Sequence, residues 1–121
     1  ATPTELLEPI FAGLDVALVV CGHTHMQFDR TIGGTRVVNA GSLGMAFGRT
    51  GADWLLLSPD VEFRHTDYDL QLANELILAS GYPQADEFVT RYLLNPPSEP
   101  DMLEIYRTAE PKLALRNQQL A

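Results

Sequence analysis

The chain of 121 residues predicts one domain of mixed α/β class. Three observations support this class. Residues 3–13 carry apolar side chains at helical spacing and are followed by a valine-rich run at 16–21. Between residues 27 and 67, short apolar segments alternate with turn signals, which is typical of hairpins. From residue 69 onward the apolar pattern is helical again. We therefore expect helices together with a mixed sheet.

The composition excludes several classes of protein. Eight basic residues against sixteen acidic ones give a net charge of −8 without any Lys/Arg cluster, so we expect no binding to duplex nucleic acid. No apolar run approaches the roughly 20 residues needed to span a bilayer, and no signal-peptide pattern is visible. Cys21 is the only cysteine, so it has no intramolecular partner, and we expect a cytoplasmic protein.

The first half of the chain is predicted to contain a helix and three strands. Residues 3–13 form a helix whose apolar face consists of Leu6, Leu7, Ile10, Phe11 and Leu14. Residues 16–21 lack polar alternation, so we expect a strand that is covered on both faces. Gly33 and Gly34 mark a tight turn between the hairpin arms 27–32 and 35–39.

The second half is predicted to contain another hairpin and then helices. Residues 52–58 and 61–67 form two strands joined by a turn at 58–60. A helix from residue 69 has a buried stripe of Leu70, Ala73, Leu76 and Ile77. A second helix spans about 84–94, with Phe88, Val89, Tyr92 and Leu93 facing inward. A last helix follows the break at 95–97, and Ser98 is expected to cap it.

Two histidines follow the valine-rich strand in the segment 22–25, which reads Gly-His-Thr-His. In an extended segment His23 and His25 would project to the same side. Neutral imidazole is a common ligand for divalent metals, and ligands of open α/β sheets bind beyond the strand ends. Gly22 would allow a backbone bend at this point. The pattern therefore favours a metal site at His23 and His25, although His-x-His alone also fits structural histidines.

The loop at 39–44 is a second candidate for binding. Its glycines and Ser42 allow a tight turn whose N–H groups face an anion. Asn39 and Ser42 are candidate contacts to a substrate phosphate, with an ordinary tight turn as the alternative. Arg49 follows the loop and has donors that match a phosphate, with a surface position as the alternative.

Two further charged groups are interpreted as structural. Asp29 lies near His25 in sequence, but a solvated charge beside Arg30 is favoured over a metal ligand. His65 lies near Asp67 and is interpreted as solvent-facing or ion-paired.

Residues 19–25 (Val-Val-Cys-Gly-His-Thr-His) resemble the last motif of the calcineurin-like metallophosphoesterases, in their small bacterial branch. Residues 34–44 resemble the strand and the Asn-Pro-Gly-Ser loop of that family, with Ala40 in place of Pro. Residues 67–69 and 81–83 resemble its closing segment, so the likeness covers roughly residues 3–83.

The resemblance implies a four-layer αββα sandwich with mixed sheets, followed here by C-terminal helices. It implies hydrolysis of phosphomonoesters or phosphodiesters by a metal-bridging hydroxide. The cofactor would be two divalent metal ions, drawn from Mn, Fe, Zn and Ni. His23 and His25 would each ligate one of them.

The family pattern also requires Asp-x-His, Gly-Asp-x-x-Asp and Gly-Asn-His segments before the Gly-His-x-His motif. Residues 1–21 contain none of them, and the chain begins at Ala1 rather than Met. We therefore expect a C-terminal portion of such an enzyme. In this interpretation residues 1–83 form half of the domain and residues 84–121 are its helical extension. The chain alone would lack most metal ligands and would be inactive.

The expected partners are the N-terminal half of the domain or a second chain, a phosphate-ester substrate, and a further copy of the chain. One alternative is a non-catalytic fragment that assembles with itself or with a partner chain. Another is a cupin-like metal-binding barrel, which also uses His-x-His. The barrel is disfavoured by the predicted C-terminal helices and by Ala17, which stands where cupins have a glycine.

Overall fold

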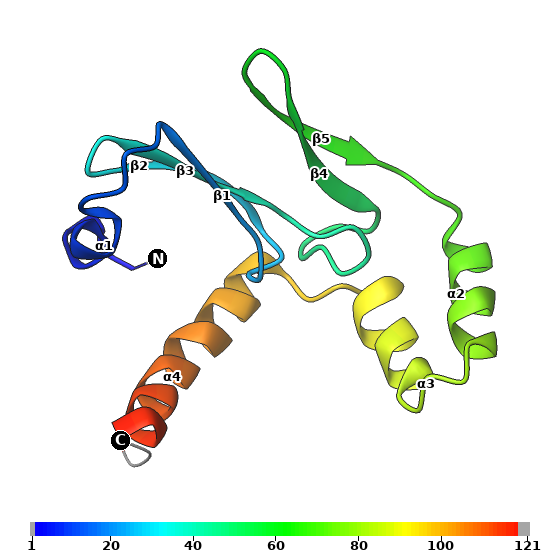
Figure 1. Cartoon of the computed structure of the whole chain (residues 1–121). Coiled ribbons are helices and arrows are strands. Elements are labelled where there is room, and N and C mark those ends of the chain that lie inside the picture. Colours follow the sequence, from blue (N-terminus) through cyan, green and yellow to red (C-terminus); the bar gives the residue numbers. More distant parts are fainter. Residues whose placement is uncertain (1, 119–121) are drawn as a thin grey trace.

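A computed structural model describes residues 2–118, with side chains from 2 to 109. The fold is mixed α/β with helices and two sheets, which confirms the predicted class (Figure 1). In chain order the elements are α1 (Thr4–Phe11), β1 (Leu18–Cys21), β2 (Gln27–Ile32), β3 (Thr35–Ala40), β4 (Ala52–Leu57), β5 (Val61–Thr66), α2 (Leu70–Ala79), α3 (Ala85–Phe88), η1 (Val89–Leu93) and α4 (Glu99–Gln118).

The first sheet is mixed and has the order β1-β3-β2. Strand β1 is parallel to β3, with Cys21 opposite Asn39, and β2 is antiparallel to β3. Gly33 and Gly34 have φ of +55° and +89°, as the predicted tight turn between β2 and β3 requires. The parallel pairing brings the carboxyl ends of β1 and β3 to the same edge of the sheet. The segments 22–25 and 41–51 therefore leave the sheet side by side.

The second sheet is the antiparallel hairpin β4-β5. The side chain of Gln27 connects the two sheets, because its Nε2 donates toward the carbonyl oxygens of Ala40 (3.3 Å), Trp54 (3.2 Å) and Arg64 (3.3 Å). In the described part of the chain both sheets are open, so the cupin-like barrel is wrong. The two sheets instead agree with part of a calcineurin-like fold.

The C-terminal part is helical, as predicted. Asp69 caps α2 by accepting hydrogen bonds from the backbone of the first turn. The predicted helix at 84–94 consists of α3 and the π-helical stretch η1, whose buried side chains Ala85, Val89 and Leu93 recur every four residues. Ser98 caps α4 by accepting the N–H of Asp101 (3.2 Å). Helix α4 runs away from the sheets (Figure 1), and residues 119–121 of the predicted extension lie outside the described residues.

Several apolar faces that we expected to be buried are exposed. Strand β1 was expected to be covered on both faces, yet Val20 is 45% exposed. On α1, Leu6 and Ile10 are 66% and 68% exposed, and on α2 Leu76 is 63% exposed. Helical and strand periodicity shows which residues share a face, but it does not supply a neighbouring element to cover that face. No helix within the described residues has both the length and the apolar composition needed to cross a bilayer.

Candidate metal centre

The two histidines lie in a loop that follows β1, and their backbone is not extended. His23 has a φ of +79° and His25 a φ of +60°, so both are in the left-handed region. The expected extended geometry is therefore wrong. Gly22 does not make the bend either, since its φ is not positive and an added Cβ would meet no atom within 4 Å. Such backbone costs about 1–3 kcal/mol per residue and persists only where the surroundings hold it.

Asn39, near the end of β3, stabilises this loop through side-chain hydrogen bonds. Its side chain is fully buried, and Nδ2 donates to Gly22 O (2.8 Å) and to Thr24 Oγ1 (3.0 Å). Its Oδ1 accepts the N–H of Gly41 (2.9 Å). The amide therefore joins the loops that follow β1 and β3. Direct contact of Asn39 with substrate stays a prediction, whereas its position gives it a structural role.

The imidazole of His25 is oriented by two contacts from the segment 41–51. Its Nδ1 lies 3.0 Å from the carbonyl oxygen of Met45. Because a carbonyl can only accept, Nδ1 carries the proton in the neutral ring, and the lone pair is on Nε2. The ring also stacks on Phe47, with centroids 5.3 Å apart and planes at 11°. A backbone carbonyl holding one ring nitrogen is the usual support of a metal-ligating histidine.

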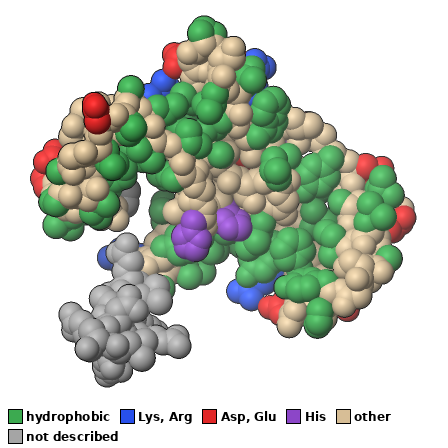
Figure 2. Space-filling view, in the orientation of Figure 1, with side chains coloured by type: hydrophobic (Ala, Val, Ile, Leu, Met, Phe, Trp, Pro, Cys, Tyr) green, Lys and Arg blue, Asp and Glu red, His purple; other side chains and the backbone are tan. Residues whose placement is uncertain are grey.

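His23 is exposed. Figure 2 shows histidine side chains (purple) next to one another on the molecular surface. Imidazole nitrogens suit divalent metals, and ligation of a metal by His23 and His25 stays a prediction. Among the residues that the structure describes, no group of three or more His, Cys, Asp or Glu side chains converges on one point. Catalytic metal sites ordinarily use at least three protein ligands, so two imidazoles form only part of one.

Ser42 and Arg49 are both engaged in contacts within the protein. Ser42 Oγ accepts the N–H of Met45 (3.1 Å), and its carbonyl accepts the N–H of Asp53 (2.8 Å). Arg49 Nη2 donates to Asp53 Oδ1 and to Gln27 Oε1 (3.2 Å), while half of its side chain stays exposed. Substrate contacts of these two residues remain predictions.

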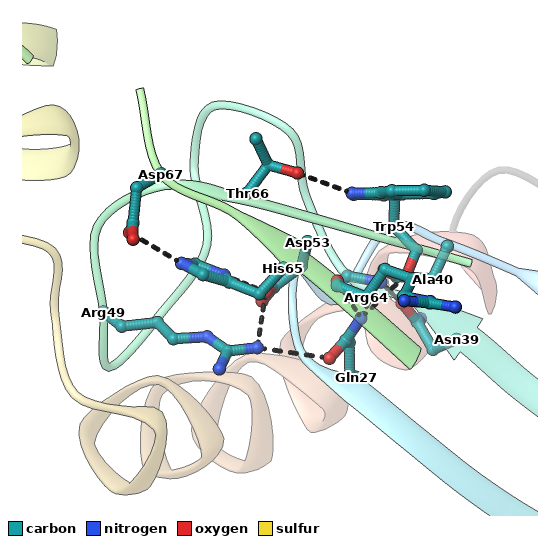
Figure 3. Close-up of polar contacts among 11 residues, drawn as sticks. Gln27, Asn39, Ala40, Arg49, Asp53, Trp54, Arg64, His65, Thr66 and Asp67 are labelled. Carbon is teal, nitrogen blue, oxygen red and sulfur yellow. Dashed lines mark hydrogen bonds and ion pairs between the residues drawn. The ribbon is translucent and has the colours of Figure 1, made fainter. Parts of the chain in front are cut away.

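A polar cluster that the sequence did not single out centres on Asp53 (Figure 3). Asp53 is 5% exposed, and its Oδ1 also lies 2.7 Å from Nδ1 of His65. The other ring nitrogen of His65 lies 3.3 Å from Asp67 Oδ1, in agreement with the expected ion-paired histidine. The sequence signal that could have revealed this cluster is Asp53 itself, the single carboxylate in the otherwise apolar strand β4.

Asp29 is exposed, in agreement with the expected solvated charge, but Arg30 is not its ion-pair partner. Its partner is Arg36 on the adjacent strand, whose Nη2 lies 2.8 Å from Asp29 Oδ2 and whose Nη1 lies 2.7 Å from Asp60. The register explains the difference, because Asp29 and Arg36 belong to neighbouring strands whereas consecutive residues point to opposite faces. The Arg36 hydrogen bond lowers the pKa of Asp29 below its usual range.

Cys21 stands next to the histidine loop and is half-buried. Its Sγ donates toward the carbonyl oxygen of Val38 (3.3 Å), and burial raises the pKa of its thiol. Cys21 is therefore a packed thiol and not an activated nucleophile.

One family model matches part of the chain. Residues 4–60 match the family model of the calcineurin-like phosphoesterase superfamily domain. The match extends from α1 to the turn before β5, so it includes the histidine loop, Asn39, Ser42 and Arg49. No curated protein matches the chain.

Proposed function

We propose, from the match of residues 4–60 to the calcineurin-like phosphoesterase superfamily domain, that the chain is part of a metal-dependent phosphoesterase. The reaction is hydrolysis of phosphomonoesters or phosphodiesters. The superfamily is generally metal-dependent, and the proposed cofactor is a pair of divalent ions such as Mn, Fe, Zn or Ni. We also propose a cytoplasmic location, in keeping with the unpaired Cys21.

The observation that supports this proposal is the backbone strain of the histidine loop, together with the hydrogen bonds that stabilise it. Left-handed backbone at both His23 and His25 raises the free energy of the folded chain, and it is maintained by the buried amide of Asn39. Backbone strain of this kind clusters at functional sites. His25 presents Nε2 for ligation because Nδ1 is held by Met45. When bound, divalent metals would supply charge stabilisation to the phosphoryl group and lower the pKa of water.

The two histidines need additional ligands. We propose that Asp, His or Asn groups beyond the described residues, in a longer form of the chain or in a partner chain, complete the site. The 121-residue chain alone then binds metal weakly and hydrolyses phosphate esters at a negligible rate, because two ligands do not close a catalytic site.

We further propose that residues 84–121 are a helical extension of the domain formed by residues 1–83. The N–H of Gly48 donates to the carbonyl oxygen of Pro97 (2.8 Å), just before α4. This bond connects the loop that orients His25 to the segment of the extension that precedes α4.

The test is calorimetric titration of the chain with Mn²⁺ and Zn²⁺, followed by assays with p-nitrophenyl phosphate and bis(p-nitrophenyl) phosphate. His23→Ala and His25→Ala should each weaken binding at least about 10-fold, since each removes one ligand. Asp29→Asn is the control, because Asp29 is paired with Arg36, and it should leave affinity unchanged. Metal binding that survives both histidine variants would contradict the ligand assignment. Rapid hydrolysis by the 121-residue chain would contradict the incomplete site.

Assembly is a second candidate role, and the exposed apolar side chains favour it. Leu6 and Ile10 on α1 and Val20 on β1 are 66%, 68% and 45% exposed, and β1 is an edge strand of its sheet. Exposed apolar faces beside a strand edge favour contact with another chain. Light scattering across a dilution series tests this role, and a stable monomer at all concentrations would refute self-association.

A further inference from the structure

Asp53 is a buried carboxylate held between two parts of the chain. Its Oδ1 accepts hydrogen bonds from Arg49 in the segment 41–51 and from His65 on β5 (Figure 3). A carboxylate that is 5% exposed must be paired, because its desolvation is otherwise expensive. Asp53 therefore connects the segment 41–51 to the hairpin β4-β5.

The backbone around Asp53 contacts the same segment. The N–H of Asp53 donates to the carbonyl of Ser42 (2.8 Å). A Cβ added to Gly41, whose φ is +85°, would lie 2.6 Å from Cβ of Asp53. Asp53 therefore contacts the segment 41–51 near both of its ends. The contacts are with Gly41 and Ser42 at the beginning and with Arg49 toward the end.

The segment 41–51 is also the part of the chain that orients His25. It contributes the carbonyl of Met45 and the ring of Phe47, which are the two contacts of the imidazole described above. Ser42 Oγ accepts the N–H of Met45 (3.1 Å), so hydrogen bonds lead from the backbone N–H of Asp53 through Ser42 to Met45, whose carbonyl oxygen contacts His25.

We propose that Asp53, together with Arg49 and His65, is the positioning group that fixes the orientation and tautomer of the His25 imidazole. Asp53 acts through the segment 41–51 and does not touch the metal or the substrate. The inference rests on the proposed function of His25 as a ligand. Groups that orient a ligating histidine without touching the metal change metal affinity by roughly 10–100-fold.

The test compares Asp53→Asn with Asp67→Asn. Both variants replace a carboxylate that contacts His65, but the side chain of Asp67 is 94% exposed and makes its hydrogen bond to His65 and not to the segment 41–51. Nitrogen-15 NMR of the imidazoles in the metal-free chain reports which nitrogen of His25 is protonated. Zn²⁺ titration reports the affinity.

The parent and Asp67→Asn should show the Nδ1-protonated ring of His25 and equal Zn²⁺ affinity. Asp53→Asn should show mixed tautomers and about 10-fold weaker Zn²⁺ binding. Should Asp53→Asn not fold, Arg49→Gln removes one donor to the carboxylate at a half-exposed position and should shift both readouts in the same direction.

An Asp53→Asn variant that matches Asp67→Asn in both readouts overturns the positioning role. A parent chain that binds no Zn²⁺ at His23 and His25 refutes the proposed function instead. In that case the imidazole shifts of the metal-free chain still decide whether Asp53 positions His25.

Discussion

Replacing Asn39 with Ala should destabilise the protein and release the histidine loop. The substitution removes three hydrogen bonds, to Gly22 O, Thr24 Oγ1 and Gly41 N. Each contributes about 1 kcal/mol net. Relief of the left-handed backbone at the histidines offsets a part of this loss. We therefore expect the free energy of unfolding to fall by about 3 kcal/mol.

Urea unfolding followed by circular dichroism measures this change as a shift of the midpoint at constant slope. Asn95→Ala is the matched control, because Asn95 is exposed and makes one hydrogen bond, from Nδ2 to Thr90 O (3.0 Å). We expect less than about 1 kcal/mol for the control. Amide exchange at Gly41 should also accelerate in Asn39→Ala.

A loss below about 1 kcal/mol in Asn39→Ala, equal to that of the Asn95 control, would refute the argument that the buried amide holds the strained loop. A large loss of stability with unchanged protection of Gly41 would refute the proposed link between the two loops, since the broken bonds would then lie elsewhere.

Three further predictions follow from local contacts. Gly51→Ala should cost at least about 2 kcal/mol in urea unfolding, because the added Cβ would lie 2.6 Å from ring atoms of His65 at a φ of +105°. Arg36→Gln should lower the melting temperature near neutral pH. The pKa of Asp29 is depressed in the folded state, so the stabilisation is fully present above its ordinary pKa of 3.8, and the difference from the parent should disappear as the pH falls through the lower pKa of the folded state. Cys21 should react with a thiol reagent more slowly in the folded chain than in urea, because burial raises the pKa of its thiol.

Each of these has a clear contrary result. Gly44→Ala is the control for the glycine, because an added Cβ there meets no atom within 4 Å, and equal losses in both variants would contradict the steric argument. A melting difference for Arg36→Gln that persists in strong acid would show that the carboxylate pairing is not its cause. Equal thiol rates in folded and unfolded chains would contradict the packed position of Cys21.

Local sequence signals were sufficient for the elements. The tight turn at Gly33 and Gly34 requires positive φ, and the glycines reveal it directly. The period of apolar residues distinguishes helices from strands, so the elements agree with expectation to within a few residues. The motif at 22–25, which follows a strand, also indicated the family whose model matches residues 4–60.

The sequence by itself determined the types of the elements, their order and the place of His23 and His25 at a strand end, because these depend on neighbouring residues. Only the tertiary structure decided the conformation and support of the histidine loop. Asn39 reaches Gly22 across 17 positions, and Met45 reaches His25 across 20. Such contacts depend on the parallel register of β1 and β3, which no local pattern encodes. The exposure of apolar faces was decided in the same way, because an amphipathic pattern specifies a face and not its neighbour.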